Sequence, residues 1–324
     1  MSAVLPIDLP VDPETESQLR RGEKKGERDI AKRTKKRLTS RGATIAALLI
    51  AVIWTIPTFG LFVSSFRPAQ QVRTTGWWTM FSNWGVTLDN YSDVLAAGNS
   101  QLNLAGAFIN SIAITLPATM LPLIIASLAA YAFAWIDFRG KDILFIAVFA
   151  LQIVPLQMAL VPLLQLFSQG TIFGYPVVEA LNADGGYAQV WIAHTMFALP
   201  LAIFLLYNFV SEIPSEVIEA ARVDGAGHGQ IFFRIILPLT MPALASFAIF
   251  QFLWVWNDLL VALIFADGAV APMTKLLAEI TGSRGQDWHL LTAGAFISIL
   301  VPLLVFFALQ RFFVRGLLAG STKG

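Results

Sequence analysis

The sequence predicts an all-α membrane protein with six transmembrane helices and with both ends of the chain in the cytoplasm. Three observations predict this fold class. Of the 324 residues, 56% are hydrophobic and 13% are charged, whereas an ordinary soluble domain has roughly 25% charged residues. Six stretches without Asp, Glu, Lys or Arg are each at least 23 residues long. The Lys and Arg residues are distributed unevenly between the alternate connections of these stretches.

The six charge-free stretches define the predicted spans. A helix that crosses about 30 Å of hydrocarbon needs about 20 mostly apolar residues, and every stretch exceeds this length. The stretches 94–136 and 143–178 have polar or glycine-rich ends, so each predicts one helix plus a loop. The predicted spans are residues 43–64, 107–135, 143–167, 187–210, 239–265 and 290–312.

The placement of Lys and Arg predicts the orientation, because cytoplasmic segments carry an excess of these residues. With the N-terminus inside, the cytoplasmic segments hold 18 Lys and Arg residues and the outer loops hold 4. Residues 1–42 contain 11 of them and lack apolar periodicity, which predicts a disordered basic tail near the anionic inner leaflet. The length of this tail favours a membrane anchor over a cleaved signal peptide.

The sequence shows few groups with chemical reactivity. It contains no cysteine, which excludes a thiol nucleophile and a cysteine-ligated metal. His194, His228 and His289 lie in different segments without metal-ligand spacing. Asp258 is the one acid well inside an apolar stretch, whereas an ion-coupled pump usually needs several such acids. The sequence therefore predicts no catalytic residue and no metal site, and it disfavours a nucleic-acid binder.

The cytoplasmic connection 211–238 predicts two short helices joined by a tight turn and set parallel to the membrane. Ser215 is placed to cap the first helix. Asp224-Gly225 predicts its end, because glycine accepts a positive φ at low cost. Residues 230–236 predict the second, amphipathic helix. The residues alone fit a surface for another protein and an interfacial helix on lipid equally well.

This connection resembles the EAA loop of bacterial ABC importer permeases. The resemblance rests on Glu219-Ala220-Ala221, Asp224-Gly225-Ala226 and their spacing to Leu237-Pro238. Further stretches resemble the carbohydrate group, and within it the maltose-type permease whose C-terminus is cytoplasmic: Asn110-Ser111, Ala129–Ala134, Phe138–Lys141, Trp256-Asn257-Asp258 and Gln310–Gly324. The aromatic-rich outer loop, residues 74–101, resembles the α-glucoside branch.

The resemblance covers about residues 40–324 and implies the type I ABC importer permease fold in the bacterial cytoplasmic (inner) membrane. It divides the chain into four regions. These are a basic cytoplasmic tail (1–42), the first transmembrane helix with its outer loop (43–104), the ABC permease domain with the coupling loop 211–238 (105–313), and a cytoplasmic C-terminal tail (314–324).

The function that the resemblance implies is that of a non-catalytic permease subunit importing a sugar, either a di- or oligosaccharide or an α-glucoside. Its partners would be a second permease in a heterodimer, two ATPase subunits, an extracytoplasmic sugar-binding protein and membrane lipid. No cofactor would be bound by this chain, because ATP and Mg²⁺ would be used by the ATPases. The alternatives are an ABC permease for a non-sugar solute, an ion-coupled secondary transporter and an integral-membrane enzyme.

The resemblance also assigns roles to residues. It implies ATPase coupling by Glu219, Ala220, Ala221, Asp224 and Gly225, and a C-terminal ATPase contact by Ser321, Thr322 and Lys323. Amide and aromatic side chains at mid-membrane depth suit a sugar, and interhelical hydrogen bonding is the alternative role for each. These substrate-path candidates are Asn110, Gln152, Gln157, Gln251, Trp254 and Asn257.

The cysteine-free sequence makes the predicted topology testable by single-cysteine labelling. A cysteine at Ser215 should be protected from a membrane-impermeant maleimide in intact cells, because the coupling loop is predicted to be cytoplasmic. A cysteine at Ser82, in the predicted outer loop, should react under the same conditions. Labelling at position 215 from outside would reverse the orientation.

Overall fold

The computed structural model describes residues 41–95, 103–181, 186–266, 268–282 and 287–319. The chain divides into two units, residues 1–60 and 61–324. In the first unit, the described residues belong to α2 (Arg41–Ser65), a helix of 25 residues. Its side chains are apolar around the circumference, and Trp54 is 78% exposed. Such a helix requires lipid or another protein around it.

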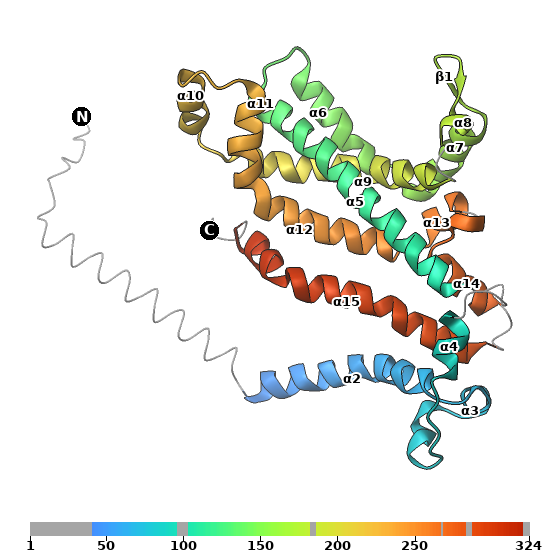
Figure 1. The fold of residues 1–324 in the computed structure, drawn as a ribbon. Helices are drawn as coiled ribbons and strands as arrows, with labels where there is room; N and C mark the ends of the chain where they lie inside the picture. The colour runs from blue at the N-terminus through green and yellow to red at the C-terminus, as the bar shows by residue number, and fades with distance from the viewer. Residues whose placement is uncertain (1–40, 96–102, 182–185, 267, 283–286, 320–324) are drawn as a thin grey trace, which may run out of the picture. The chain divides into compact units, whose positions relative to one another are not determined.

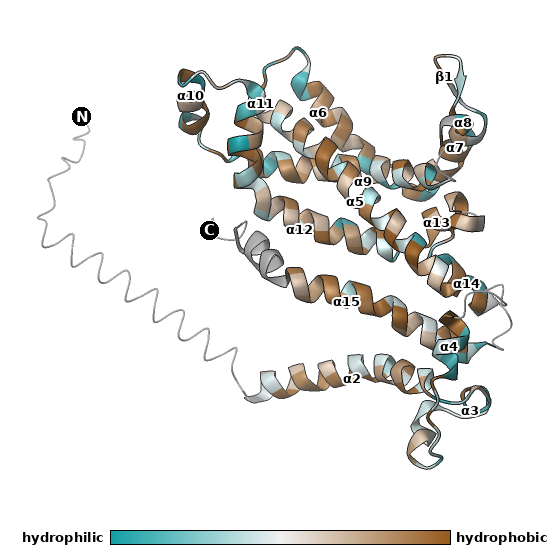
Figure 2. Ribbon diagram, in the orientation of Figure 1, coloured by the Kyte–Doolittle hydropathy of each residue, from teal (hydrophilic) through white to brown (hydrophobic). Residues whose placement is uncertain are grey.

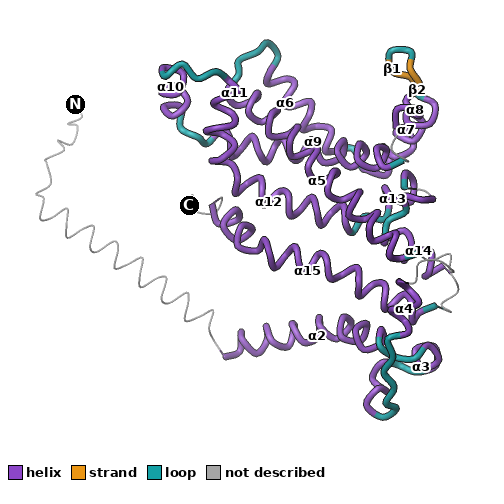
Figure 3. The backbone as a smooth tube through the Cα atoms, viewed as in Figure 1, coloured by secondary structure: helices purple, strands orange, loops and turns teal. Residues whose placement is uncertain are grey.

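The second unit is almost entirely helical in its described part, with one short β-hairpin (Figure 3). Strands β1 and β2 pair antiparallel, with Thr171 opposite Pro176 and Ile172 opposite Tyr175. After α2, the elements in chain order are α3 (Ala69–Thr74), η1 (Trp77–Phe81), α4 (Asp89–Leu95), α5 (Leu104–Trp135), α6 (Lys141–Ala150), η2 (Leu151–Ile153), α7 (Leu156–Gln169), β1 (Thr171–Ile172), β2 (Tyr175–Pro176), α8 (Val177–Leu181), α9 (Tyr187–Ser211), α10 (Ser215–Val223), α11 (His228–Ile231), η3 (Phe232–Ile236), α12 (Leu237–Trp256), α13 (Leu260–Phe265), η4 (Gly268–Val270), α14 (Met273–Gly282) and α15 (Trp288–Ala319).

The predicted fold class is confirmed within the described residues. Five helices are long and apolar enough to cross a membrane, and the bent pair of α6 and α7 makes a sixth span when it is counted as one. Helix α5 packs along α9 and α12, and α15 packs along α12 (Figure 1). Figure 2 shows hydrophobic residues along α5, α12 and α15, with hydrophilic residues gathered at α10 and α11 at one end and at α4 at the other.

The third span is not the continuous helix predicted over residues 143–167. α6 and η2 end at Ile153, and the following helix α7 leaves at an angle of 104°. Pro155 explains the break, because proline lacks an N–H and disfavours helical geometry at the residue before it. Val154 accordingly takes extended backbone angles, with φ −69° and ψ 117°.

The fifth span also differs from its predicted limits of 239–265. α11, η3 and α12 form one helical stretch, His228–Trp256. Residues 230–236 are therefore the start of the span and not a separate helix parallel to the membrane. Within the stretch, η3 is a π-turn, in which Leu237 N–H donates to the carbonyl of Phe232, five residues earlier. The chain then breaks after Trp256, so α13 is a separate short helix.

The sixth span continues further than predicted. Helix α15 extends through Ala319 and so includes the first residues of the expected C-terminal tail, 314–324. Residues 320–324 lie outside the described part of the chain.

Arg67 organises the connection that follows α2, and its side chain is fully buried. Its Nη1 donates to the carbonyls of Thr75 and Gly76 at 3.3 and 3.0 Å. Its Nη2 donates to the hydroxyls of Thr75 and Thr79 at 2.6 and 3.0 Å. Burial lowers the pKa of the guanidinium from its usual value, and these acceptors offset the desolvation. The predicted outer loop therefore begins as a folded segment.

We expect Arg67→Met to loosen residues 69–81, because it removes the side-chain donor to the part-buried Thr75 carbonyl and one of three donors to the Gly76 carbonyl, which Thr79 still contacts. The cost of unsatisfied buried acceptors is about 1–3 kcal/mol each. Limited proteolysis of the purified protein should then cut within this segment, and the thermal midpoint should fall. Arg73→Gln is the matched control, since Arg73 is 43% exposed and its ion pair with Asp287 is 3.8 Å long. Equal protease resistance in both variants would contradict the role of Arg67.

Candidate functional site

Helix α10 has a well-defined start and end. Its first residue is Ser215, and Pro214 precedes it at the N-cap position without a side-chain cap. The prediction that Ser215 caps the helix is therefore wrong, because Pro214 occupies the N-cap and Ser215 is the first helical residue. Proline suits this position because it lacks the N–H that a helix interior would need. At the other end, Gly225 has φ +81°, as its position after Asp224 predicts.

The turn after α10 is a Schellman motif. Ala226 N–H donates to the Ala221 carbonyl at 2.9 Å, and Gly225 N–H donates to the Arg222 carbonyl at 3.0 Å. Both Ala221 and Ala226 pack against the same hydrophobic cluster. This pairing satisfies the last carbonyls of the helix and requires a residue with positive φ at its centre. The backbone direction between α10 and α11 is thereby fixed.

One face of α10 is docked on the bundle and the opposite face is open. Ile218 is 1% exposed and belongs to a cluster with Leu206 of α9 and Ile231 of α11. Arg222 donates through Nη2 to the Trp135 carbonyl at the end of α5, at 3.2 Å. Glu219 and Ala220 are exposed. The helix can therefore receive another protein on one side while the other side stays joined to three spans.

Further hydrogen bonds attach the turn to the bundle. The hydroxyl of Tyr131 in α5 lies 2.8 Å from Nδ1 of His228, the first residue of α11. Gln230 Oε1 accepts from Gly227 N–H at 3.1 Å. The hydrophobic cluster that holds Ile218 extends to Phe247 in the middle of α12. Packed side chains therefore form a continuous connection from α10 into the interior of the spans.

A cavity of about 430 Å³ lies where the third span breaks. We call it the broken-span cavity, and it is bounded by η2, the start of α7, the middle of α9 and α12. Its volume is within the range of small-molecule sites. The residues that line it are Leu151, Gln152, Val154, Pro155, Leu156, Ala159, His194, Met196, Phe197, Ala198, Pro200, Leu201, Phe247, Gln251 and Trp254.

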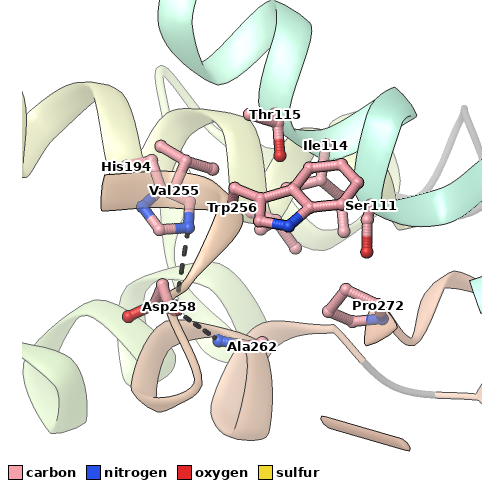
Figure 4. A pocket seen from close by; sticks show the side chains of 10 residues that line it. Ser111, Ile114, Thr115, His194, Val255, Trp256, Asp258, Ala262 and Pro272 are labelled. Carbon is pink, nitrogen blue, oxygen red and sulfur yellow. Dashed lines mark hydrogen bonds and ion pairs between the residues drawn. The ribbon is translucent and has the colours of Figure 1, made fainter. Parts of the chain in front are cut away.

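A second, much smaller cavity of about 10 Å³ lies beside the first (Figure 4). We call it the small polar cavity, and its polar lining comes from Ser111 and Thr115 of α5, His194 of α9 and Asp258. His194 Nε2 is 3.8 Å from Asp258 Oδ2. The same Oδ2 accepts from the N–H groups of Val261 and Ala262 at 3.0 and 3.2 Å. Asp258 thus caps α13.

The structure separates the substrate-path candidates into two groups. Gln152, Gln251 and Trp254 line the broken-span cavity. Asn110, Gln157 and Asn257 are not among its lining residues.

Three of the candidates have side-chain amides that form hydrogen bonds within the fold. Asn110 donates to the carbonyls of Ala269 and Ala271, and Tyr187 donates to its Oδ1. Asn257 donates to the Leu253 carbonyl at 2.8 Å. Gln251 donates to the Ala118 carbonyl at 3.2 Å while still lining the cavity.

The C-terminal contact residues and His194 complete the comparison with the predicted site residues. Ser321, Thr322 and Lys323 lie outside the described residues. His194 was not among the substrate-path candidates, although it lines both cavities. The signal in the sequence was an ionisable side chain within an apolar stretch, but its partner Asp258 lies in another segment of the chain and only the fold brings the two together.

Comparisons with known proteins agree with this geometry. A family model described as "Binding-protein-dependent transport system inner membrane component" matches residues 122–318. The chain is 53% identical to the osmoprotective compounds uptake permease protein GgtD of Synechocystis sp., over 86% of this chain and 91% of that protein. It is 39% identical to the alpha-glucoside transport system permease protein AglG of Rhizobium meliloti, over 86% and 96%.

The fold also matches a solved structure. In the crystal structure of a bacterial alginate ABC transporter with an alginate pentasaccharide-bound periplasmic protein, one chain superposes with a TM-score of 0.61. The match covers 86% of this chain and 96% of that chain at 15% sequence identity, which shows the fold alone.

The apolar spans and the docked α10 define the membrane subunit of an ABC importer with the type I permease fold. The family match is consistent with this class and covers more than half of the chain. This chain belongs to the inner membrane components of binding-protein-dependent transport systems. It is accordingly a multi-pass protein of the inner membrane.

We expect Gly225→Val to impair transport while the protein still inserts into the membrane. The site around Gly225 is open, so the cost comes from the positive φ alone, at roughly 1–2 kcal/mol for a side chain in this region. The matched control is Gly227→Val, because Gly227 also has open space but a φ of −76°. Transport in reconstituted vesicles should fall for position 225 only. Equal rates for both variants would mean that the turn geometry is dispensable.

Proposed function

We propose that this chain is one of two permease subunits of an ABC importer that carries a neutral α-glucoside into the cytoplasm. An extracytoplasmic binding protein delivers the sugar, and two partner ATPases supply the energy. The observation that carries the proposal is the broken-span cavity, which places hydrogen-bonding side chains along the otherwise apolar spans.

The lining of this cavity supports a neutral polyhydroxyl solute. Its polar side chains are Gln152, Gln251, His194 and the indole of Trp254. None of its described lining residues is Asp, Glu, Lys or Arg. Amides can donate and accept hydrogen bonds with hydroxyl groups, and an indole face can cover the C–H surface of a sugar ring. An ion would find no countercharge here.

Similar proteins support the α-glucoside class. One relative is named for alpha-glucoside transport and another for osmoprotective compounds. Trehalose satisfies both descriptions, because it is a neutral α-glucoside that is also a compatible solute. A second candidate is a zwitterionic osmoprotectant such as glycine betaine, which the 53% identity to the osmoprotective permease favours. The uncharged cavity disfavours it.

Helix α10 supports the coupling part of the proposal. Exposed Glu219 and Ala220 offer a small surface with one carboxylate, to which an ATPase can dock. Closure of the ATPases on ATP and Mg²⁺ would move α10, and the cluster from Ile218 to Phe247 would carry this movement to the cavity. Hydrolysis itself belongs to the ATPases, and this chain binds no cofactor.

The proposal predicts ATP-dependent uptake of radiolabelled trehalose by proteoliposomes that contain both permeases, the ATPases and the binding protein. Sucrose, another α-glucoside, should compete, and glycine betaine should not. Uptake of glycine betaine without uptake of trehalose would favour the second candidate and contradict the first.

A matched pair of variants tests the cavity itself. Gln152 and Gln157 are both exposed side chains of the third span, but only Gln152 lines the cavity. We expect Gln152→Leu to reduce trehalose uptake about two- to tenfold, the effect of one lost hydrogen bond of about 0.5–1.5 kcal/mol, and Gln157→Leu to leave it near wild type. The reverse order would place the sugar path elsewhere.

A further inference from the structure

His194 forms a shared wall of the two cavities. It lines the broken-span cavity together with Gln251 and Trp254, and it lines the small polar cavity together with Thr115 and Asp258. The side chain is only 3% exposed. An imidazole in such a position presents a different nitrogen to each side, because its two ring nitrogens lie on opposite edges.

Asp258 holds one edge of this ring. Its Oδ2 lies 3.8 Å from His194 Nε2 and accepts from two N–H groups of α13. Its carbonyl accepts from the Thr274 hydroxyl at 2.6 Å. The carboxylate is therefore held by two bonds from α13, and the backbone of the same residue is held by one bond from α14. Within the described residues, Asp258 is the polar partner that the structure gives His194.

The gap between Nε2 and Oδ2 is too long for a direct hydrogen bond, but the small polar cavity lies beside it. Its volume of about 10 Å³ is that of one water molecule. The Thr115 residue is 1% exposed and lines the same cavity. One water there would join Nε2–H to the carboxylate. In the tautomer with the proton on Nε2, this water would accept from Nε2–H and donate to the carboxylate, and Nδ1 would be left as a hydrogen-bond acceptor.

The second nitrogen, Nδ1, lies on the other edge of a ring that also lines the broken-span cavity. Figure 4 shows it on the edge of the ring that faces away from Ser111 and Thr115. The other polar side chains of the broken-span cavity can each donate, through the amides of Gln152 and Gln251 and the indole N–H of Trp254. A dedicated acceptor with a fixed tautomer complements these donors, because every sugar hydroxyl both donates and accepts.

We propose that His194 is a specificity-determining residue of the transport path, whose Nδ1 accepts a hydrogen bond from one hydroxyl of the transported α-glucoside. Asp258 is its positioning residue, acting on the ring through Nε2. This inference rests on the proposed function and adds the contact that selects a hydroxyl at one position of the sugar. It also joins occupancy of the cavity to α13, since the same carboxylate caps that helix.

Two amide variants separate the ring nitrogens. The amide of Asn reaches the place of Nδ1, whereas the amide of Gln reaches the place of Nε2. The measurement is the amount of radiolabelled trehalose retained by the complete complex after trapping with ATP and vanadate, which reports the permease cavity and not the binding protein. We expect His194→Gln to retain about two- to tenfold less trehalose than wild type, and His194→Asn to recover most of the loss.

Deoxy analogues of trehalose provide the readout that a purely structural role would not move. The wild-type complex should retain one of these analogues less well than trehalose, by the same factor by which His194→Gln reduces the retention of trehalose. The His194→Gln complex should retain this analogue as well as it retains trehalose. Asp258→Asn keeps an oxygen for Val261 and Ala262 but removes the charge, so it should weaken the preference for trehalose over the same analogue. Additive losses for every analogue would overturn the contact.

Other outcomes are equally decisive. Equal retention by wild type and His194→Gln would overturn the inference alone, and equal losses in the Gln and Asn variants would overturn the assignment to Nδ1. Copurification of the ATPases with each variant checks assembly. Should His194→Gln fail to assemble, Asp258→Asn and the analogue series in the wild type decide the question. If the wild-type complex neither transports nor retains trehalose, the proposed substrate class fails and this inference fails with it.

Discussion

Hydrocarbon offers no hydrogen-bond partner to the peptide group, and the arrangement of this bundle follows from that constraint. Every span must be helical wherever lipid surrounds it. Irregular backbone is tolerated only where protein or a wet cavity covers it. The chain nevertheless breaks twice, at Val154-Pro155 and after Trp256. The first break forms a wall of the broken-span cavity, and the second is held by Asp258 beside the small polar cavity.

The second break shows how the freed backbone groups are satisfied. Asp258 Oδ2 accepts from the first N–H groups of α13, and Lys275 Nζ donates to the Ala266 carbonyl at the end of the same helix, at 2.8 Å. Both ends of a six-residue helix are thereby tied by charged side chains. By the predicted topology, both charged side chains lie at the outer ends of the spans. There they stabilise the backbone of α13 and do not face the lipid core.

At the other end of the bundle, α10 is attached to the spans at several points. α10 is joined to the spans by Ile218, by Arg222 and by the Schellman turn at Gly225, so it cannot shift without moving its neighbours. Between this helix and the cavity lies one continuous hydrophobic cluster that ends at Phe247. The π-turn of η3 lies within this path, and such turns are frequent at functional sites.

The sequence predicted the approximate positions of the spans, the short helix α10 and the positive φ of Gly225, because these depend on composition and on local chemistry. The sequence did not predict the break at Pro155. Charge-free runs report polarity alone, and many prolines in membrane spans lie within continuous helices. The sequence also did not predict the uninterrupted stretch His228–Trp256, because the glycines around His228 and the proline at Pro238 are typical of helix ends. The pairing of His194 with Asp258 depends on how distant segments pack, which local pattern does not encode.

The central claim is that the break in the third span opens a water-lined path and not a groove filled by lipid. Neighbouring residues of α7 test it directly, since Ala159 lines the cavity while Met158 is 71% exposed on another face. Each is changed to cysteine in the cysteine-free chain of the assembled transporter. The account predicts that a charged methanethiosulfonate modifies position 159, that trehalose slows this reaction, and that position 158 reacts only with a lipid-soluble maleimide. Modification of 159 by the lipid-soluble reagent alone would contradict it.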